Sequence, residues 1–166
     1  MNEADACDQY VLPKLRAAGW GNQPHSIRRE YQFTAGQIVV SAHSVQRRRK
    51  KIADFILNYA QDFPIAVVEV KAIDRSPDAG LQQAKSYAEM LGLQFAYATN
   101  GEKIIEFDFS NNQVRELEEF PQPEELWARL RSFQGLDENK AVNYLLTPSV
   151  GLEARSYQIA AINRAI

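Results

Sequence analysis

Charged side chains interrupt two apolar segments of this sequence, and their types suit metal-assisted chemistry. Asp54 stands inside the run 52–58, while Glu69 and Lys71 stand two residues apart in the run 65–71. A charge in an apolar strand is costly unless it is paired or belongs to a site. Mg²⁺ prefers oxygen ligands, and a bound divalent cation activates water and neutralises phosphoryl oxygens. The pattern favours metal-assisted hydrolysis, with Asp54 and Glu69 as metal ligands.

Two further groups of the second run fit this chemistry. The backbone carbonyl of Val70 offers another oxygen ligand, and Lys71 could orient the attacking water or stabilise negative charge in the transition state. The alternative is a solvated edge strand, on which Glu69 and Lys71 simply share one exposed face. The apolar neighbours of Glu69 and the matching Asp54 make the metal site the stronger interpretation.

The two runs must pair if these side chains are to meet. Residues 52–58 and 65–71 are both strand-like, and the six residues between them, 59–64, are a hairpin-length connection. Alternation places Glu69 and Lys71 on one face of their strand. A hairpin would then bring Asp54 beside Glu69.

The remaining elements predict an α/β fold with a mixed β-sheet flanked by helices. The first helix should be kinked or divided at Pro13. The strand over 27–33 should form a hairpin with residues 38–40, and a tight turn at 100–101 should join two later strands. The further expected elements are a helix over 81–92, strands over 94–99 and 103–109, and a helix over 123–133.

Composition narrows the class of protein. The 166 residues are 45% hydrophobic and 24% charged, which is the balance of a folded domain. One cysteine excludes an intramolecular disulfide and a Cys-based zinc site, and two isolated histidines make no cluster. The apolar runs are too short to cross a membrane, and the first residues lack the features of a signal peptide, so we expect a cytoplasmic protein.

The net charge of −2 is unevenly distributed along the sequence. Residues 1–80 carry 11 Lys or Arg against 9 Asp or Glu, whereas residues 81–166 carry 8 against 12. The positive half contains the run Arg47, Arg48, Arg49, Lys50 and Lys51, which precedes Asp54. This run either contacts DNA phosphates or is a solvated loop.

The spacing of Asp54 and Glu69-Val70-Lys71 resembles the signature of the PD-(D/E)xK nuclease superfamily, with Ala53 in place of the proline. Gln83 and Tyr87 are similar to the Gln-x-x-x-Tyr helix motif of its RecB-like branch. Four residues apart on a helix, they share a face. The resemblance implies a restriction-endonuclease-like fold, Mg²⁺ (with Mn²⁺ as substitute), and Gln83 and Tyr87 beside the site holding DNA.

The chain as a whole resembles the N-terminal nuclease domain of the R subunit of type I restriction-modification enzymes. The resemblance implies a type I site-specific deoxyribonuclease that cuts double-stranded DNA together with methyltransferase (M) and specificity (S) subunits. The alternatives are a catalytically silent DNA-binding or subunit-docking module and a stand-alone DNA repair nuclease. The matching segments are 3–7, 12–15, 17–20, 30–31, 54–55, 69–72 and 99–101.

The last residues are similar to the opening of a superfamily-2 helicase, in which the residue at Gln158 contacts the nucleotide. No Walker-type phosphate-binding loop occurs in the 166 residues, so ATP would be used only by a motor outside them. We therefore expect an endonuclease domain over 1–134, a linker over 135–152 and the first helix of a truncated translocase over 153–166.

Relatives in this superfamily often add an acidic metal ligand from the first helix. Glu3, Asp5 and Asp8 are all candidates for that ligand, and Glu30 could instead enter from the first hairpin. Glu3 and Asp5 lie nearest the N-terminus and are alternatively partners of the helix dipole, which leaves Glu30 and Asp8 as the two retained candidates.

Overall fold

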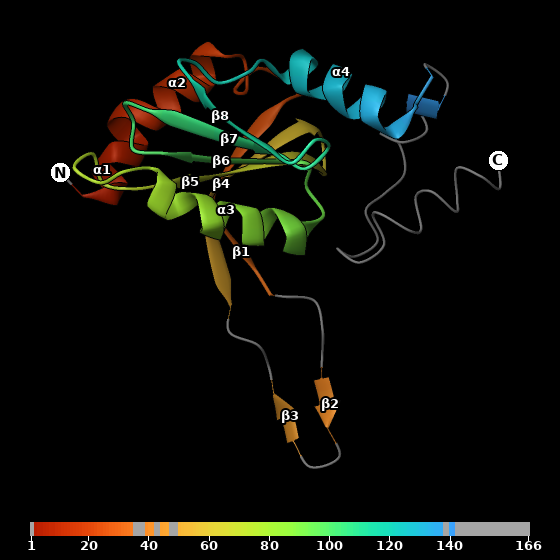
Figure 1. The fold of residues 1–166 in the computed structure, drawn as a ribbon, viewed down its shortest axis with the longest axis horizontal. Helices are drawn as coiled ribbons and strands as arrows, with labels where there is room; N and C mark the ends of the chain where they lie inside the picture. The colour runs from red at the N-terminus through yellow and green to blue at the C-terminus, as the bar shows by residue number, and fades with distance from the viewer. Residues whose placement is uncertain (1, 35–38, 42–43, 47–49, 138–139, 142–166) are drawn as a thin grey trace.

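The structure, a computed structural model, describes residues 2–34, 39–41, 44–46, 50–137 and 140–141. A six-stranded mixed sheet forms its centre, in the order β1-β4-β5-β6-β7-β8 (Figure 1). β5 and β6 are parallel and every other neighbouring pair is antiparallel. The strands are β1 (Ser26–Phe33), β4 (Lys51–Ala60), β5 (Phe63–Val70), β6 (Phe95–Thr99), β7 (Ile104–Asp108) and β8 (Gln113–Leu117).

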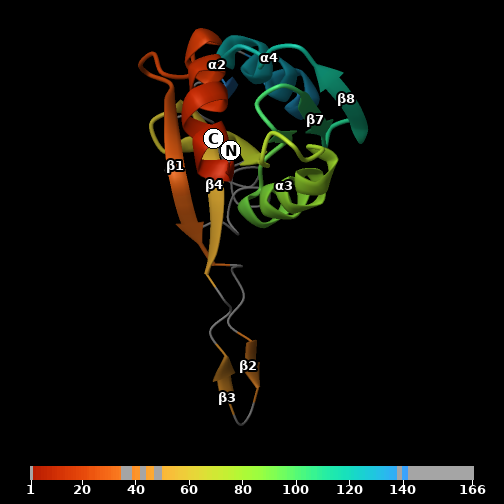
Figure 2. The same cartoon turned by 90° about the vertical axis from the view of Figure 1, so that its left-hand side faces the viewer.

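Helices cover both faces of the sheet, which explains why its central strands are apolar on both sides. The crossover helix α3 (Asp78–Leu91) connects the parallel strands and packs Leu81, Ala84 and Leu91 on one face. The opposite face carries the N-terminal helical segment and α4 (Pro123–Gln134) (Figures 1 and 2). The fold is the restriction-endonuclease-like α/β architecture that the sequence predicts.

The N-terminal helical segment is divided, as expected from Pro13. It consists of α1 (Glu3–Ala6), a π-helical turn η1 (Cys7–Val11) and α2 (Leu12–Ala17), with the proline in the first turn of α2. The backbone stays right-handed helical through both junctions, so the division is a change to π-helical hydrogen bonding just before Pro13, whose missing N–H removes an ordinary helical bond. Cys7 is buried, as a small hydrophobic residue would be.

The predicted hairpin between residues 27–33 and 38–40 is wrong. β1 pairs with β4 over the whole range from Ser26↔Asn58 to Phe33↔Lys51. β2 (Val39–Ser41) pairs instead with β3 (Ser44–Gln46) in a separate two-stranded sheet that projects from the body (Figure 2). The physical reason is burial: pairing with β4 packs Phe33 of β1 against α3, which a local hairpin would not do.

The other predicted elements are confirmed, with boundaries shifted by one to three residues. The pairs β4–β5 and β6–β7 are hairpins, and α3 is capped by Gly92, which adopts the left-handed conformation at φ 65°. β8 was not predicted. Arg47, Arg48, Arg49, Gln158, most of the 135–152 segment and all of 153–166 lie outside the described residues. Within the described part of the chain, no helix has the length and apolar character needed to span a membrane.

Candidate active site

The candidate site lies where β4 and β5 separate. Their paired register ends at Phe55 and Val68. Beyond that point, the Asp54 carboxylate accepts a hydrogen bond from the Val70 amide at 2.7 Å. The Glu69 carboxylate in turn accepts one from the Asp54 amide at 3.4 Å. Side-chain oxygens thus replace the backbone ladder, and the two carboxylates that the sequence singled out lie next to each other.

The two carboxylates are shielded from water and poorly neutralised. Glu69 is only 1% exposed and Asp54 is half-buried. Burial, followed by the negative charge of Asp54, raises the pKa of Glu69 from 4.5 to about 8. Burial also raises the pKa of Asp54, although the Val70 amide and Lys71 oppose that shift. Among the described residues, neither carboxylate forms a salt bridge. The site therefore holds more negative potential than the protein neutralises.

Lys71 follows directly after β5 and supplies the cation nearest to the pair. Its amide donates to the Thr99 carbonyl at 2.8 Å, which extends the β5–β6 pairing by one residue. Its ammonium lies 3.4 Å from Oε1 of Gln83 and 3.5 Å from Oε1 of Glu3. Because these two oxygens hold the ammonium, Lys71 is positioned beside the carboxylates without forming an ion pair to either one.

Gln83 and Tyr87 lie together on α3, as their spacing predicts. The Gln83 amide nitrogen donates to the Tyr87 hydroxyl at 3.2 Å, while its oxygen accepts from Lys71. The amide orientation of Gln83 is thereby fixed from both ends. The two motifs identified in the sequence form one connected set of contacts in space.

Gly80 was not identified from the sequence, yet it determines where the Lys71 side chain can lie. A Cβ atom at this position would stand 3.2 Å from Cε and 3.3 Å from Cγ of Lys71. The absence of a side chain lets the lysine stem cross α3 closely. Nothing in the sequence beyond the glycine itself signals this contact.

The structure separates the acidic candidates near the N-terminus. Glu3, a candidate ligand or alternatively a partner of the helix dipole, faces the site and raises the pKa of both Asp54 and Glu69. Asp8, a candidate metal ligand, is instead ion-paired with Arg29 at 2.5 Å. The register of β1 with β4 puts Glu30, at φ 46°, opposite Asp54, whose pKa it also raises.

The donor set of this site suits Mg²⁺, which keeps several water ligands, better than it suits a metal that needs a complete shell of protein ligands. Among the residues that the structure describes, no three His, Cys, Asp or Glu side chains form a metal-binding group. The structure brings the two carboxylates together, and the sequence adds the Val70 carbonyl as an expected third oxygen. Mg²⁺ is commonly bound through one or two carboxylates, with water and substrate phosphate completing its octahedron. The uncompensated burial of Asp54 and Glu69 is also what a site for an added cation requires.

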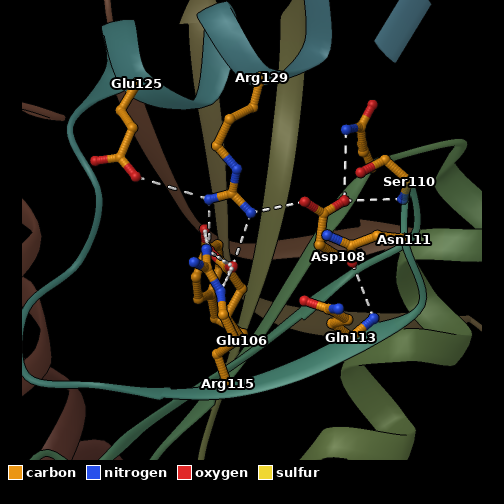
Figure 3. A network of polar contacts seen from close by, with 10 residues as sticks. Glu106, Asp108, Ser110, Asn111, Gln113, Arg115, Glu125 and Arg129 are labelled. Atoms are coloured by element: carbon orange, nitrogen blue, oxygen red, sulfur yellow. Dashed lines mark hydrogen bonds and ion pairs between the residues drawn. The ribbon is translucent and has the colours of Figure 1, made fainter. Parts of the chain in front are cut away.

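A second group of buried carboxylates lies on β7, on the face covered by α4 (Figure 3). Glu106 is fully buried and accepts hydrogen bonds from Arg115 at 2.6 Å and Arg129 at 2.8 Å. Tyr97 donates to the same carboxylate at 2.6 Å, and Arg129 also binds Asp108 at 2.7 Å. We call these five residues the β7 ion network. It is saturated with donors and so has a structural role.

The fold and the site define a restriction-endonuclease-like α/β protein, and comparison with known proteins agrees. The family model for the type I restriction enzyme R protein N terminus matches residues 24–121. The chain belongs to this family.

Two relatives extend the match over the chain. The Type I restriction enzyme EcoAI endonuclease subunit of Escherichia coli is 32% identical over 176 residues, which is 100% of this chain and 22% of the relative. A solved structure described as "the fragment structure of a putative HsdR subunit of a type I restriction enzyme from Vibrio vulnificus YJ016" is 47% identical, with a TM-score of 0.80. The match covers 99% of this chain and 32% of the chain in the solved structure. The chain spans about a fifth and a third of these relatives.

Proposed function

We propose that this chain is the Mg²⁺-dependent endonuclease domain of a type I restriction enzyme R subunit and hydrolyses phosphodiester bonds of double-stranded DNA. The observation that carries the proposal is the contact between the buried Glu69 and the half-buried Asp54 where β4 and β5 separate, with no ion pair to either carboxylate among the described residues. Membership of the R protein family supports the same conclusion. We expect M and S subunits as partners in the cytoplasm, and an ATP-driven motor outside this chain.

Each residue has a distinct role in this proposal. The carboxylates of Asp54 and Glu69 and the carbonyl of Val70 would hold Mg²⁺, which would supply an activated water and neutralise phosphoryl charge. The Val70 amide fixes the orientation of the Asp54 carboxylate. Lys71, held by Gln83 and Glu3, places its ammonium where it can orient the attacking water and stabilise charge in the transition state.

The direct test is plasmid nicking by the longer R protein together with its partner subunits. Asp54→Ala and Lys71→Ala should each abolish cleavage, whereas Asp62→Ala, an exposed carboxylate of the β4–β5 turn, should leave it unchanged. Cleavage that survives in either of the first two variants would refute the assignment of those residues.

Metal calorimetry separates the enzyme from a silent nuclease-like module. The 166-residue chain should bind Mg²⁺ or Mn²⁺, and Glu69→Gln should lose that binding. Glu89→Gln changes an exposed carboxylate of α3 and is the matched control. No metal binding in the unaltered chain would favour the DNA-binding or docking alternative.

A further inference from the structure

A continuous line of contacts leads from Lys71 across α3 to the strand pair β1–β4. It starts with Lys71, Gln83 and Tyr87, joined by the hydrogen bonds described above. The Tyr87 ring then meets Phe33 edge to face, with centroids 5.0 Å apart. Phe33 stacks on Tyr31 at 6.2 Å. The proposed catalytic lysine is therefore connected to a group of aromatic side chains outside the recognised motifs.

A second lysine lies at the far end of this line. The ammonium of Lys51 stands 5.6 Å from the centre of the Tyr87 ring, and Lys51 is paired with Phe33 in the β1–β4 register. We call Tyr31, Phe33, Lys51 and Tyr87 the ribbon cluster. Two cations thus stand on either side of the Gln83–Tyr87 hydrogen bond, one beside the carboxylates and one on the ribbon cluster.

The charge of Lys51 is available to a partner outside the described residues. Two other cations of this strand pair, Arg28 and Arg29, lie further along β1 and are ion-paired with Asp62 at 2.9 Å and with Asp8. Lys51 has no such carboxylate among the residues the structure describes. Its stem is half-buried, so its position is more restricted than that of a freely extended surface lysine.

We propose that Lys51 binds a backbone phosphate of the DNA strand that reaches Asp54 and Glu69, and that the ribbon cluster holds its ammonium for that contact. This inference rests on the proposed nuclease function and extends it to substrate binding outside the motif residues. The phosphodiester backbone is a regular row of anions, and a lysine bound to it acts as a positioning contact without reading sequence. Lys50, exposed next to Lys51, adds positive potential, whereas Glu30 is an acid on the adjacent strand.

The test is binding of the 166-residue chain to a short labelled DNA duplex, measured by fluorescence anisotropy in EDTA over a series of salt concentrations. Lys51→Met keeps the apolar stem on the Tyr87 ring and removes only the charge. It should weaken binding about threefold to tenfold and reduce the salt slope by about one. Lys51→Arg should restore both values.

Lys140→Met is the matched control, because Lys140 is an exposed lysine paired with Asp137 beyond α4. It should change the slope much less than Lys51→Met does. Thermal melts establish that every variant is folded, and the arginine variant reports on the charge even if the methionine variant is unstable. Equal slopes for the two methionine variants, or no binding of duplex DNA by the unaltered chain, would overturn the inference.

The two proposals fail in different ways. If the plasmid test fails while Lys51→Met still reduces the slope, the chain holds DNA without cutting it. If nicking depends on Asp54 while Lys51→Met binds normally, the nuclease assignment stands and the role of Lys51 does not.

Discussion

Two pairs of buried carboxylates lie on opposite faces of one sheet, and their electrostatics are opposite. At Glu106 and Asp108, burial acts to raise each pKa, but hydrogen bonds from Arg129 and other donors leave both below their ordinary values. At Asp54 and Glu69, burial raises each pKa, and within the described part of the chain no arginine is ion-paired with either carboxylate. A structural pair is neutralised by arginines within the fold, whereas at the candidate site Glu69 retains a proton up to about pH 8, which an added cation would displace. Burial alone does not separate the two cases.

The largest effect should come from removing the cation of the structural pair. Arg129→Ala leaves Glu106 and Asp108 buried with incomplete compensation, and breaking such a pair costs about 3–5 kcal/mol. Urea unfolding followed by the fluorescence of the buried Trp20 and Trp127 measures the loss. Glu125→Ala removes an exposed partner of the same arginine and should cost less than about 0.5 kcal/mol. A loss below about 1 kcal/mol for Arg129→Ala would mean that the network is not a structural one.

The same isosteric substitution should have opposite signs at the two pairs. Glu106→Gln removes the charge that two arginines and Tyr97 require and should destabilise the fold by about 2–4 kcal/mol. Glu69→Gln removes a buried acid with a raised pKa and should stabilise it by about 1–3 kcal/mol at pH 7. Both values come from denaturant unfolding in metal-free buffer. If the two variants shifted stability in the same direction, the contrast between the pairs would be refuted.

The pairs should also act on different parts of the pH profile of stability. Glu69 has a pKa of about 8 in the fold against 4.5 as its ordinary value, so between these pH values the native state binds the extra proton. Stability should therefore fall as pH rises from about 4.5 to 8, and Asp54 adds to the fall. Glu106 and Asp108 have lowered pKa values, so their contribution is present above the ordinary range and is lost as pH falls below it.

Unfolding free energies across pH, without metal, measure both limbs. Glu69→Gln should flatten the fall toward pH 8 and leave the acid limb unchanged. The exposed Glu89→Gln should leave both limbs as they are. A fall toward pH 8 that persists in Glu69→Gln would place the responsible group elsewhere.

The smallest effect is expected at Gly80, which affects the lysine and neither carboxylate. Gly80→Ala would bring a methyl group to 3.2 Å from Cε of Lys71 and displace its stem by a few tenths of an ångström. We expect about a twofold to tenfold lower kcat for cleavage by the longer protein. Affinity for Mg²⁺ should not change, because Asp54 and Glu69 keep their contacts. Loss of metal affinity would show that the substitution disturbs the whole site.

The sequence is enough to locate the candidate site, but it does not show how that site differs from the β7 ion network. Asp54 and Glu69 are visible because they interrupt apolar strands, and hairpin pairing brings them together as expected. Glu106 and Asp108 interrupt an equally apolar strand. Their compensating Arg129 lies more than 20 residues further along the chain on α4. Only the tertiary structure reveals that partner, so local pattern cannot tell a neutralised pair from an open one.

The errors in the predicted fold have the same origin. The hairpin proposed for β1 relied on the turn residues at 35–36, whereas the real partner, β4, is distant in sequence and is selected by burial against α3. β8 escaped prediction because it is a mostly exposed edge strand with only two apolar side chains, Val114 and Leu117, among polar residues. Sequence position alone does not show which acid of the N-terminal helical segment faces the sheet, so Glu3, Asp5 and Asp8 could not be separated without the structure.

The two edge strands of the sheet, β1 and β8, also affect whether molecules of this protein associate with one another. An edge strand exposes unpaired backbone groups and can template the addition of strands from another molecule. β8 carries Arg115 and Glu116 along its edge, followed by two further glutamates. β1 carries Arg28 and Arg29, and the left-handed conformation of Glu30 interrupts its extended backbone. Charge on one edge, and charge with a backbone irregularity on the other, oppose open-ended β-aggregation of a domain whose central strands are strongly apolar.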